Sequence, residues 1–202
     1  MGVQLHHDDL PPGRSFGSAV AIDTETLGLN INRDRLCLVQ LSGGDGNAEL
    51  IQFREDYAAP RLTELLGDES VLKLFHYARF DMAVLKHTFG VLPKPVYCTK
   101  IASRIARTFT DRHGLKDLCR ELLNVELSKQ QQSSDWGADR LSPEQLAYAA
   151  SDVLHLHAIK EKLEAMLKRE GRENLARACI DFLPIRVELD LRGWSEMDPF
   201  AH

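Results

Sequence analysis

An apolar run that ends in two acids constrains this chain most. Residues 19–22 (Ala-Val-Ala-Ile) form the run, and Asp23 and Glu25 follow it two positions apart. If the run is a β-strand, side chains two residues apart project from one face, so the two carboxylates lie side by side. Adjacent carboxylates repel each other, and a hard divalent cation with oxygen ligands relieves that repulsion. Solvated acids at a strand end give the same pattern, so the metal interpretation depends on partners elsewhere in the chain.

Length and composition indicate one globular unit. The chain has 202 residues, of which 44% are hydrophobic, enough to bury a sizeable core. No segment approaches the run of about 18 apolar residues that a membrane helix needs, and residues 1–14 lack the pattern of a secretion signal. We expect a single domain over residues 1–202, with a flexible segment at 1–15 and a helical extension at 171–202. We also expect a cytoplasmic location with no membrane contact.

Cysteine spacing and net charge each restrict the function. The four cysteines are dispersed with no C-x-x-C pair, which argues against a zinc site and against a disulfide scaffold. The formal net charge is -5. Net charge alone does not exclude nucleic acid, because local basic patches can flank an acidic site that holds metal.

Periodicity predicts a mixed α/β sheet. Three apolar runs with hairpin-length connections indicate an antiparallel meander, and a helix before the fourth run permits a parallel crossover. Glycine and proline mark several element ends, and Pro184 should kink or split the last helix. We predict strands at residues 18–23, 35–42, 48–53 and 71–75 with a short extended piece bracketed by Pro93 and Pro95, and helices at 59–66, 78–89, 99–107, 115–123, 143–169 and 172–191.

Two further segments offer partners for Asp23 and Glu25. Asp81 lies in the first turn of a predicted helix, directly after a predicted strand. Tyr148 and Asp152 are four residues apart and share one helical face. Taken singly, Asp81 is also explained as an acid that complements a helix macrodipole, and Asp152 as a surface acid beside a packed tyrosine.

Taken together, these segments resemble the tyrosine branch of the DEDD superfamily of 3′-to-5′ exonucleases, and ribonuclease D in particular. Asp23 to Thr26 is similar to the first exonuclease motif, His76 to Asp81 to the second, and Tyr148 with Asp152 to the third. The resemblance spans residues 18–156, and it implies an RNase H-like fold with a mixed five-stranded sheet flanked by helices. Also similar to that family are Leu38 to Leu41, Ser134 to Trp136 and Leu141 to Leu146.

The sequence departs from the family in two respects. Larger ribonuclease D proteins carry helical HRDC domains after the catalytic one, and this sequence ends too early to hold any. The grip on a substrate is then expected in the catalytic domain itself or in a homo-oligomer. Tyr77 stands where many relatives have asparagine, which puts in doubt any hydrogen bond from that residue to substrate.

The resemblance implies a two-ion mechanism. Two divalent ions about 4 Å apart neutralise charge on the phosphate, activate water and stabilise the leaving oxygen. By resemblance, Asp23 bridges both ions, Glu25 and Asp152 complete the site that activates water, and Asp81 acts through water. Tyr148 orients the attacking water, because a phenol with a pKa of about 10 is mostly protonated and is a poor base. An all-oxygen ligand set suits Mg²⁺ or Mn²⁺.

Substrate contacts are expected beside these acids. The resemblance places the Thr26 backbone near the terminal hydroxyl and Leu29 near the last base. His76 is a candidate for sugar-phosphate contact, and packing at a strand end explains it equally well.

Two basic sets occur at helical spacing. The first is Lys100, Arg104 and Arg107, and the second is Arg112, Lys116 and Arg120. Contact with phosphate and a solvated helical face are the two interpretations of each set, and we expect Lys100 and Arg104 to bind substrate.

These features predict a metal-dependent 3′-to-5′ exoribonuclease that releases nucleoside 5′-monophosphates from RNA 3′ ends. One alternative is the same chemistry on single-stranded DNA, as in Werner-type exonuclease domains. Another is a non-catalytic RNA-binding scaffold, which predicts loss of an acid or of Tyr148, and all are present. The small size also leaves open a nuclease for very short oligonucleotides.

Overall fold

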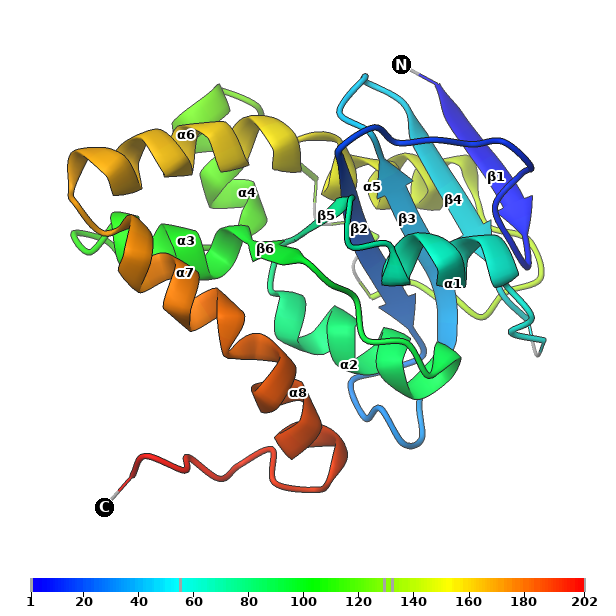
Figure 1. The fold of residues 1–202 in the computed structure, drawn as a ribbon. Coiled ribbons are helices and arrows are strands. Elements are labelled where there is room, and N and C mark those ends of the chain that lie inside the picture. The colour runs from blue at the N-terminus through cyan, green and yellow to red at the C-terminus, as the bar shows by residue number, and fades with distance from the viewer. Residues whose placement is uncertain (1, 55, 129, 132, 202) are drawn as a thin grey trace.

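A six-stranded mixed sheet forms the centre of the protein (Figure 1). The computed structural model describes residues 2–54, 56–128, 130–131 and 133–201. The strand order across the sheet is β1-β4-β3-β2-β5-β6. In chain order the elements are β1 (Val3–His7), β2 (Ala19–Thr26), β3 (Leu36–Ser42), β4 (Ala48–Gln52), α1 (Pro60–Gly67), β5 (Leu72–Phe75), α2 (Ala78–Phe89), β6 (Val96–Cys98), α3 (Thr99–Ala106), α4 (Leu115–Leu118), η1 (Cys119–Leu123), α5 (Pro143–Leu154), α6 (Leu156–Arg169), α7 (Glu173–Asp181) and α8 (Leu183–Leu191).

The predicted meander and crossover are confirmed. β2, β3 and β4 pair antiparallel in sequence, and β5 then joins β2 in parallel, with β6 parallel to β5. In the register of β2 and β3, Asp23 lies directly opposite Gln40. β5 pairs with Ala19 to Ala21 at the start of β2, whereas the end that carries Asp23 and Glu25 pairs with β3.

The number of strands differs from the prediction. β1 lies within the segment expected to be flexible, and it pairs in parallel with β4 from Val3 opposite Ala48 to His7 opposite Gln52. The prediction of five strands is therefore wrong, and residues 3–7 form a strand that the sequence analysis did not predict. β1 is a short edge strand whose residues are exposed or half-buried, so its sequence, VQLHH, lacks the apolar run that identifies a buried strand.

The helix predictions are confirmed with one correction. The predicted helix over residues 143–169 is two helices, α5 and α6, which separate at His155. α5 packs on β3 and β4 whereas α6 packs on α3 and β5, so the chain changes direction between them. Pro184 lies in the first turn of α8 and separates that helix from α7, as predicted.

The two faces of the sheet carry different helices. On one face Val20 and Ile22 belong to the core that includes α1 and α2, and on the other Ala21 belongs to the core that includes α6. Figure 1 shows α1 and α2 on one side of the sheet and α5 on the opposite side. By the two-residue period of a strand, Asp23 and Glu25 face the side of α5 and α6, and Thr24 faces the side of α2. None of the helices in the described ranges is long and apolar enough to cross a membrane.

Helix α1 is capped by a residue far away in sequence. Its own N-cap residue, Ala59, makes no side-chain capping bond. Asp9 supplies the acceptors instead: its Oδ1 accepts from the Leu62 amide at 2.9 Å and its Oδ2 from the Arg61 amide at 3.2 Å. The segment after β1 is thereby attached to the helix layer.

We predict that Asp9→Ala lowers the free energy of unfolding by about 1 kcal/mol, because two amides at the start of α1 lose their acceptor. Urea denaturation followed by circular dichroism measures this change. Asp9→Asn keeps one acceptor oxygen and should restore most of the loss. An Asp9→Ala protein with the wild-type urea midpoint would contradict the capping role.

Candidate active site

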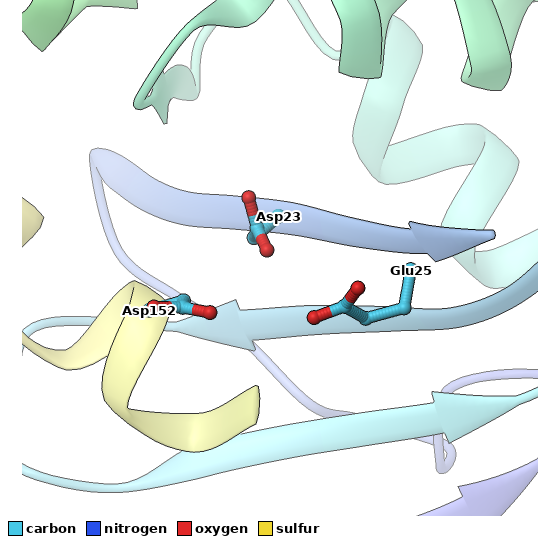
Figure 2. A group of neighbouring side chains, drawn as sticks. All are labelled: Asp23, Glu25 and Asp152. Carbon is cyan, nitrogen blue, oxygen red and sulfur yellow. The ribbon is translucent and has the colours of Figure 1, made fainter. Parts of the chain in front are cut away.

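Three carboxylates meet at the end of β2. Asp23 and Glu25 project from the strand toward α5, and Asp152 comes from α5 (Figure 2). One oxygen atom from each of the three carboxylates lies within 4.8 Å of the other two. The strand period and the helix position therefore bring together residues separated by more than a hundred positions in the chain.

Asp81 reaches the same region from the opposite side of β2. It lies in the first turn of α2, is 4% exposed, and accepts a hydrogen bond of 2.7 Å from the Thr24 hydroxyl. It is not part of the group of three, but its charge is among the causes that raise the pKa of Asp23. Thr24 thus holds the fourth acid beside the cluster.

Tyr148 lies one helical turn before Asp152, and its hydroxyl donates a hydrogen bond to the Asp152 carboxylate. Burial and the surrounding acids raise the pKa of Tyr148, so the phenol keeps its proton. The Tyr148 ring lies 6.0 Å from that of Trp136, which is 3% exposed. Trp136 is therefore a packing anchor for Tyr148.

The cluster concentrates negative charge that nearby protein groups do not neutralise. Burial is the largest cause in each case: it raises the pKa of Glu25 to about 9 and those of Asp81 and Asp152 to about 7. The pKa of Asp23 is raised well above its ordinary value by burial and then by Asp81, Asp152 and Glu25. Among the described residues, no cation offsets these shifts.

The donor set fits a hard divalent cation. The converging atoms are all carboxylate oxygens, which Mg²⁺ and Mn²⁺ accept, whereas Zn²⁺ prefers histidine or cysteine. The raised pKa values indicate that the carboxylates repel each other when all are ionised. A bound cation would remove that repulsion.

The last residue of β2 and the loop after it contain two of the predicted substrate-binding residues, Thr26 and Leu29. The Thr26 hydroxyl donates to the Gly28 carbonyl and so closes the turn that precedes Leu29. Leu29 is 84% exposed and lies at the edge of a cavity that Tyr77 also lines. An apolar side chain is thus presented to solvent four residues after Glu25 in the chain.

His76 is engaged within the protein. Its Nδ1 is hydrogen-bonded to the Thr99 hydroxyl at 2.9 Å. Burial and the nearby Lys100 lower its pKa to about 3, so the ring is neutral. These contacts favour the packing interpretation of His76.

Lys100 and Arg104 lie beside Tyr77. The Lys100 Nζ is 4.0 Å from the centre of the Tyr77 ring, and both basic residues line a cavity with Tyr77 and Arg79. Tyr77 has a left-handed backbone (φ 72°), a conformation that asparagine adopts more readily than tyrosine. The two cations therefore remain candidates for phosphate contact.

Arg107 does not belong to that basic face. It is 1% exposed, forms an ion pair with Glu121, and donates to the Arg112 carbonyl at 2.8 Å. In the second predicted set, Arg112 also pairs with Glu121, and Arg120 pairs with Asp117. For Arg107 neither the phosphate contact nor the solvated face considered for its set fits this burial.

Two polar residues at the site lie within the sequence motifs, but the sequence analysis assigned them no function. One is Thr24, the hydroxyl that binds Asp81, and the other is Gln40, whose Nε2 lies 3.4 Å from the Asp23 Oδ2. A polar side chain in the middle of an otherwise apolar buried strand is the signal that could have identified Gln40.

Comparison with known proteins identifies the family. Residues 13–168 match the 3′-5′ exonuclease family, and the chain belongs to that family. It is therefore a phosphodiester hydrolase with a ribonuclease D-like exonuclease domain, and its fold is RNase H-like.

The relatives fall into a long and a short form. Ribonuclease D of Gluconacetobacter diazotrophicus is 38% identical over 153 residues, which cover 76% of this chain and 39% of that protein. Escherichia coli RNase D is 29% identical with a TM-score of 0.75, over 84% of this chain and 45% of that one. The chain thus spans less than half the length of these relatives.

Brucella melitensis NrnC matches over the full chain. The two are 59% identical, with a TM-score of 0.96 and coverage of 100% of both chains. A structure of B. melitensis NrnC with bound Mg²⁺ is 57% identical to this chain, with a TM-score of 0.96 and coverage of 100% of both chains. A structure of B. melitensis NrnC bound to pGG is 58% identical, with a TM-score of 0.97 and coverage of 100% of this chain and 99% of that one. A protein of this size and fold therefore binds Mg²⁺ in a solved structure.

We predict that Glu25→Gln raises the stability of the metal-free protein. A folded-state pKa raised from 4.5 to about 9 contributes stability that is complete below pH 4.5 and is lost as the pH rises through 9. At pH 8 in chelator the variant should exceed wild type by at least about 1 kcal/mol, or 2–4 °C in Tm.

Thermal unfolding from pH 5 to pH 9 in chelator measures this difference, which should grow with pH. The control is Glu64→Gln, because Glu64 is exposed on α1, on the opposite side of the sheet from α5. A Glu25→Gln protein less stable than wild type at pH 8 would contradict the repulsion.

Proposed function

We propose that this 3′-5′ exonuclease is a metal-dependent exoribonuclease that releases nucleoside 5′-monophosphates, and that short oligoribonucleotides are its substrates. The observation that carries the proposal is the convergence of Asp23, Glu25 and Asp152 within 4.8 Å, beside a protonated Tyr148. The size of the substrate is suggested by the pGG bound to a relative that matches the whole chain.

The acids would hold the metal. Asp23, Glu25 and Asp152 are the residues that would hold Mg²⁺ or Mn²⁺. Asp81, held by Thr24, would act through water. Bound ions of this kind supply charge neutralisation, a nucleophilic water and stabilisation of the leaving oxygen.

Tyr148 would orient the attacking water. Because its pKa is raised, the phenol stays protonated and is a poor general base. Its proton is directed at Asp152, which leaves the phenol oxygen free to accept a hydrogen bond from water. The phenol would then fix the orientation of the water without taking up its proton.

The 3′ end of the substrate would occupy the loop after β2. We assign the Thr26 backbone to the terminal hydroxyl and the exposed Leu29 to the last base. Lys100 and Arg104 would contact phosphate. His76 would support these residues from the strand end through its bond to Thr99.

Two alternative functions differ from the proposed exoribonuclease. Hydrolysis of single-stranded DNA would use the same acids, and a non-catalytic RNA scaffold would not need them. The presence of four acids and Tyr148 in one place favours an enzyme over a scaffold. The RNA partner, a homo-oligomeric state and a cytoplasmic location belong to the same proposal.

The decisive experiment uses 5′-labelled RNA and DNA of matched sequence, including pGG, with Mg²⁺, Mn²⁺ or chelator. Wild type should shorten RNA stepwise from the 3′ end in metal, and should act on pGG faster than on longer RNA. Asp23→Ala should reduce cleavage to background because the cluster loses its central ligand. Asp111→Ala, which changes an exposed acid in the loop after α3, should cleave like wild type. Binding without cleavage in every metal would support the scaffold, and faster cleavage of DNA would support the DNA alternative.

We predict that Tyr148→Phe lowers kcat by about 100-fold while KM for pGG changes little, because the hydroxyl orients water and does not hold the substrate. Steady-state kinetics at saturating Mg²⁺ measure both constants. The matched control is Tyr97→Phe, which removes a buried hydroxyl from β6. Wild-type turnover of Tyr148→Phe would show that Tyr148 is structural.

A further inference from the structure

Gln40 occupies the position on β3 directly opposite Asp23. The two strands are antiparallel, and the register pairs these residues across the ladder. The Gln40 side chain is fully buried, and its Nε2 donates to the Asp23 Oδ2 at 3.4 Å. A neutral donor thus contacts one of the three converging carboxylates.

The other end of the Gln40 amide lacks a partner. Its Oε1 is buried and has no hydrogen bond within the described part of the chain, although buried polar groups are nearly always paired. Leu38, two residues earlier on the same face of β3, packs with Trp136 and Ala149 of the α5 layer. Gln40 therefore lies beneath α5, in the layer where Asp23, Glu25 and Asp152 meet.

An apolar residue would fill this position at lower cost. β3 reads Leu-Cys-Leu-Val-Gln-Leu-Ser and is buried along its whole length, so a glutamine at its centre gains nothing from solvent. The bond to Asp23 and the free Oε1 are the two features that leucine or methionine could not provide.

We propose that Gln40 is a positioning residue of the metal site: its amide N–H fixes the orientation of the Asp23 carboxylate, and its Oε1 accepts a hydrogen bond from a water molecule that enters with the cation. The inference rests on the proposed function, because it concerns the same metal site. Groups that orient metal ligands in this way typically contribute about 10- to 100-fold to metal affinity.

Gln52 provides a matched control on the neighbouring strand. It is also buried, lies on the same side of the sheet in β4, and has an unpaired Oε1. Its Nε2 donates to the Ala138 carbonyl at 2.9 Å, in the loop next to Trp136, and not to an acid. Each glutamine buries an unpaired Oε1. They differ in that Gln40 donates to Asp23 whereas Gln52 donates to a backbone carbonyl.

The test compares wild type, Gln40→Met and Gln52→Met, since methionine keeps the length of glutamine and removes the amide. Titration calorimetry with Mg²⁺ alone measures metal affinity, and thermal unfolding in chelator measures stability. We expect Gln40→Met to raise the Kd for Mg²⁺ by about 10-fold or more. Gln52→Met should leave that Kd unchanged, while the two variants differ little in metal-free Tm.

Kinetics separate positioning from a general structural effect. Gln40→Met should need more Mg²⁺ for half-maximal activity, whereas its KM for pGG at saturating Mg²⁺ should equal that of wild type. If Gln40→Met does not fold, Gln40→Asn withdraws the amide from Asp23 by one methylene and should give the same rise in Kd.

The outcomes distinguish this inference from the proposed function. Wild-type Mg²⁺ affinity in a folded Gln40→Met or Gln40→Asn protein would overturn the positioning role and leave the proposed function standing. An equal loss of affinity in Gln52→Met would also overturn it. A wild-type protein that neither binds Mg²⁺ nor cleaves RNA would overturn the proposed function together with the inference.

Discussion

Repulsion among buried carboxylates is the constraint on which the rest of the structure depends. Asp23 and Glu25 are forced onto one side of β2 by the strand period, and Asp152 is brought to them by α5. Burial raises the pKa of each acid, so the folded metal-free protein is less stable at neutral pH than it would be without them. A chain that keeps such a cluster gives up stability for function, and the surrounding sheet must supply the rigidity that holds the charges together.

The helix that carries Asp152 is fixed at its start. Ser142 and Gln145 form a capping box, so the first turn of α5 has a defined position and Tyr148 and Asp152 follow in later turns. The Gln145 Nε2 also donates to the Asp135 carbonyl, which ties the adjacent loop to the helix. Trp136, in that loop, packs against Tyr148. The segment from Asp135 to Gln145 therefore fixes the start of α5 and packs against the Tyr148 ring.

Much of the architecture could be predicted because apolar residues recur at strand or helix spacing within short segments. The meander, the crossover and α2 follow from apolar runs and from glycine or proline at element ends. β1 could not be predicted, since an edge strand needs few apolar residues. The break at His155 also lacked a signal, because neither glycine nor proline is near it, and the direction of α6 is set by packing on α3 and β5.

Local spacing also identified the four acids as candidate metal ligands. Several side-chain contacts could not be predicted in this way. Helical spacing placed Arg107 on the face of Lys100 and Arg104. However, α3 ends at Ala106 and Arg107 leaves the helical conformation (φ -112°, ψ 58°), so its side chain turns inward to Glu121. Spacing gives the relative direction of side chains only while the helix continues. Contacts across strands, such as that of Gln40 with Asp23, depend on a register that one sequence does not specify.

The distribution of basic residues bears on substrate length. Several arginines are already neutralised within the protein: Arg79 and Arg186 pair with Asp190, Arg107 with Glu121, and Arg120 with Asp117. In the described part of the chain, Lys100 and Arg104 near the site form no ion pair with an acid. A long nucleic acid is bound by neutralising many phosphates, each with favourable release of counterions, and this needs an extended track of free cations. Lys100 and Arg104, two cations beside Tyr77, suit a substrate with few phosphates, because they can balance a short anion but do not form an extended track.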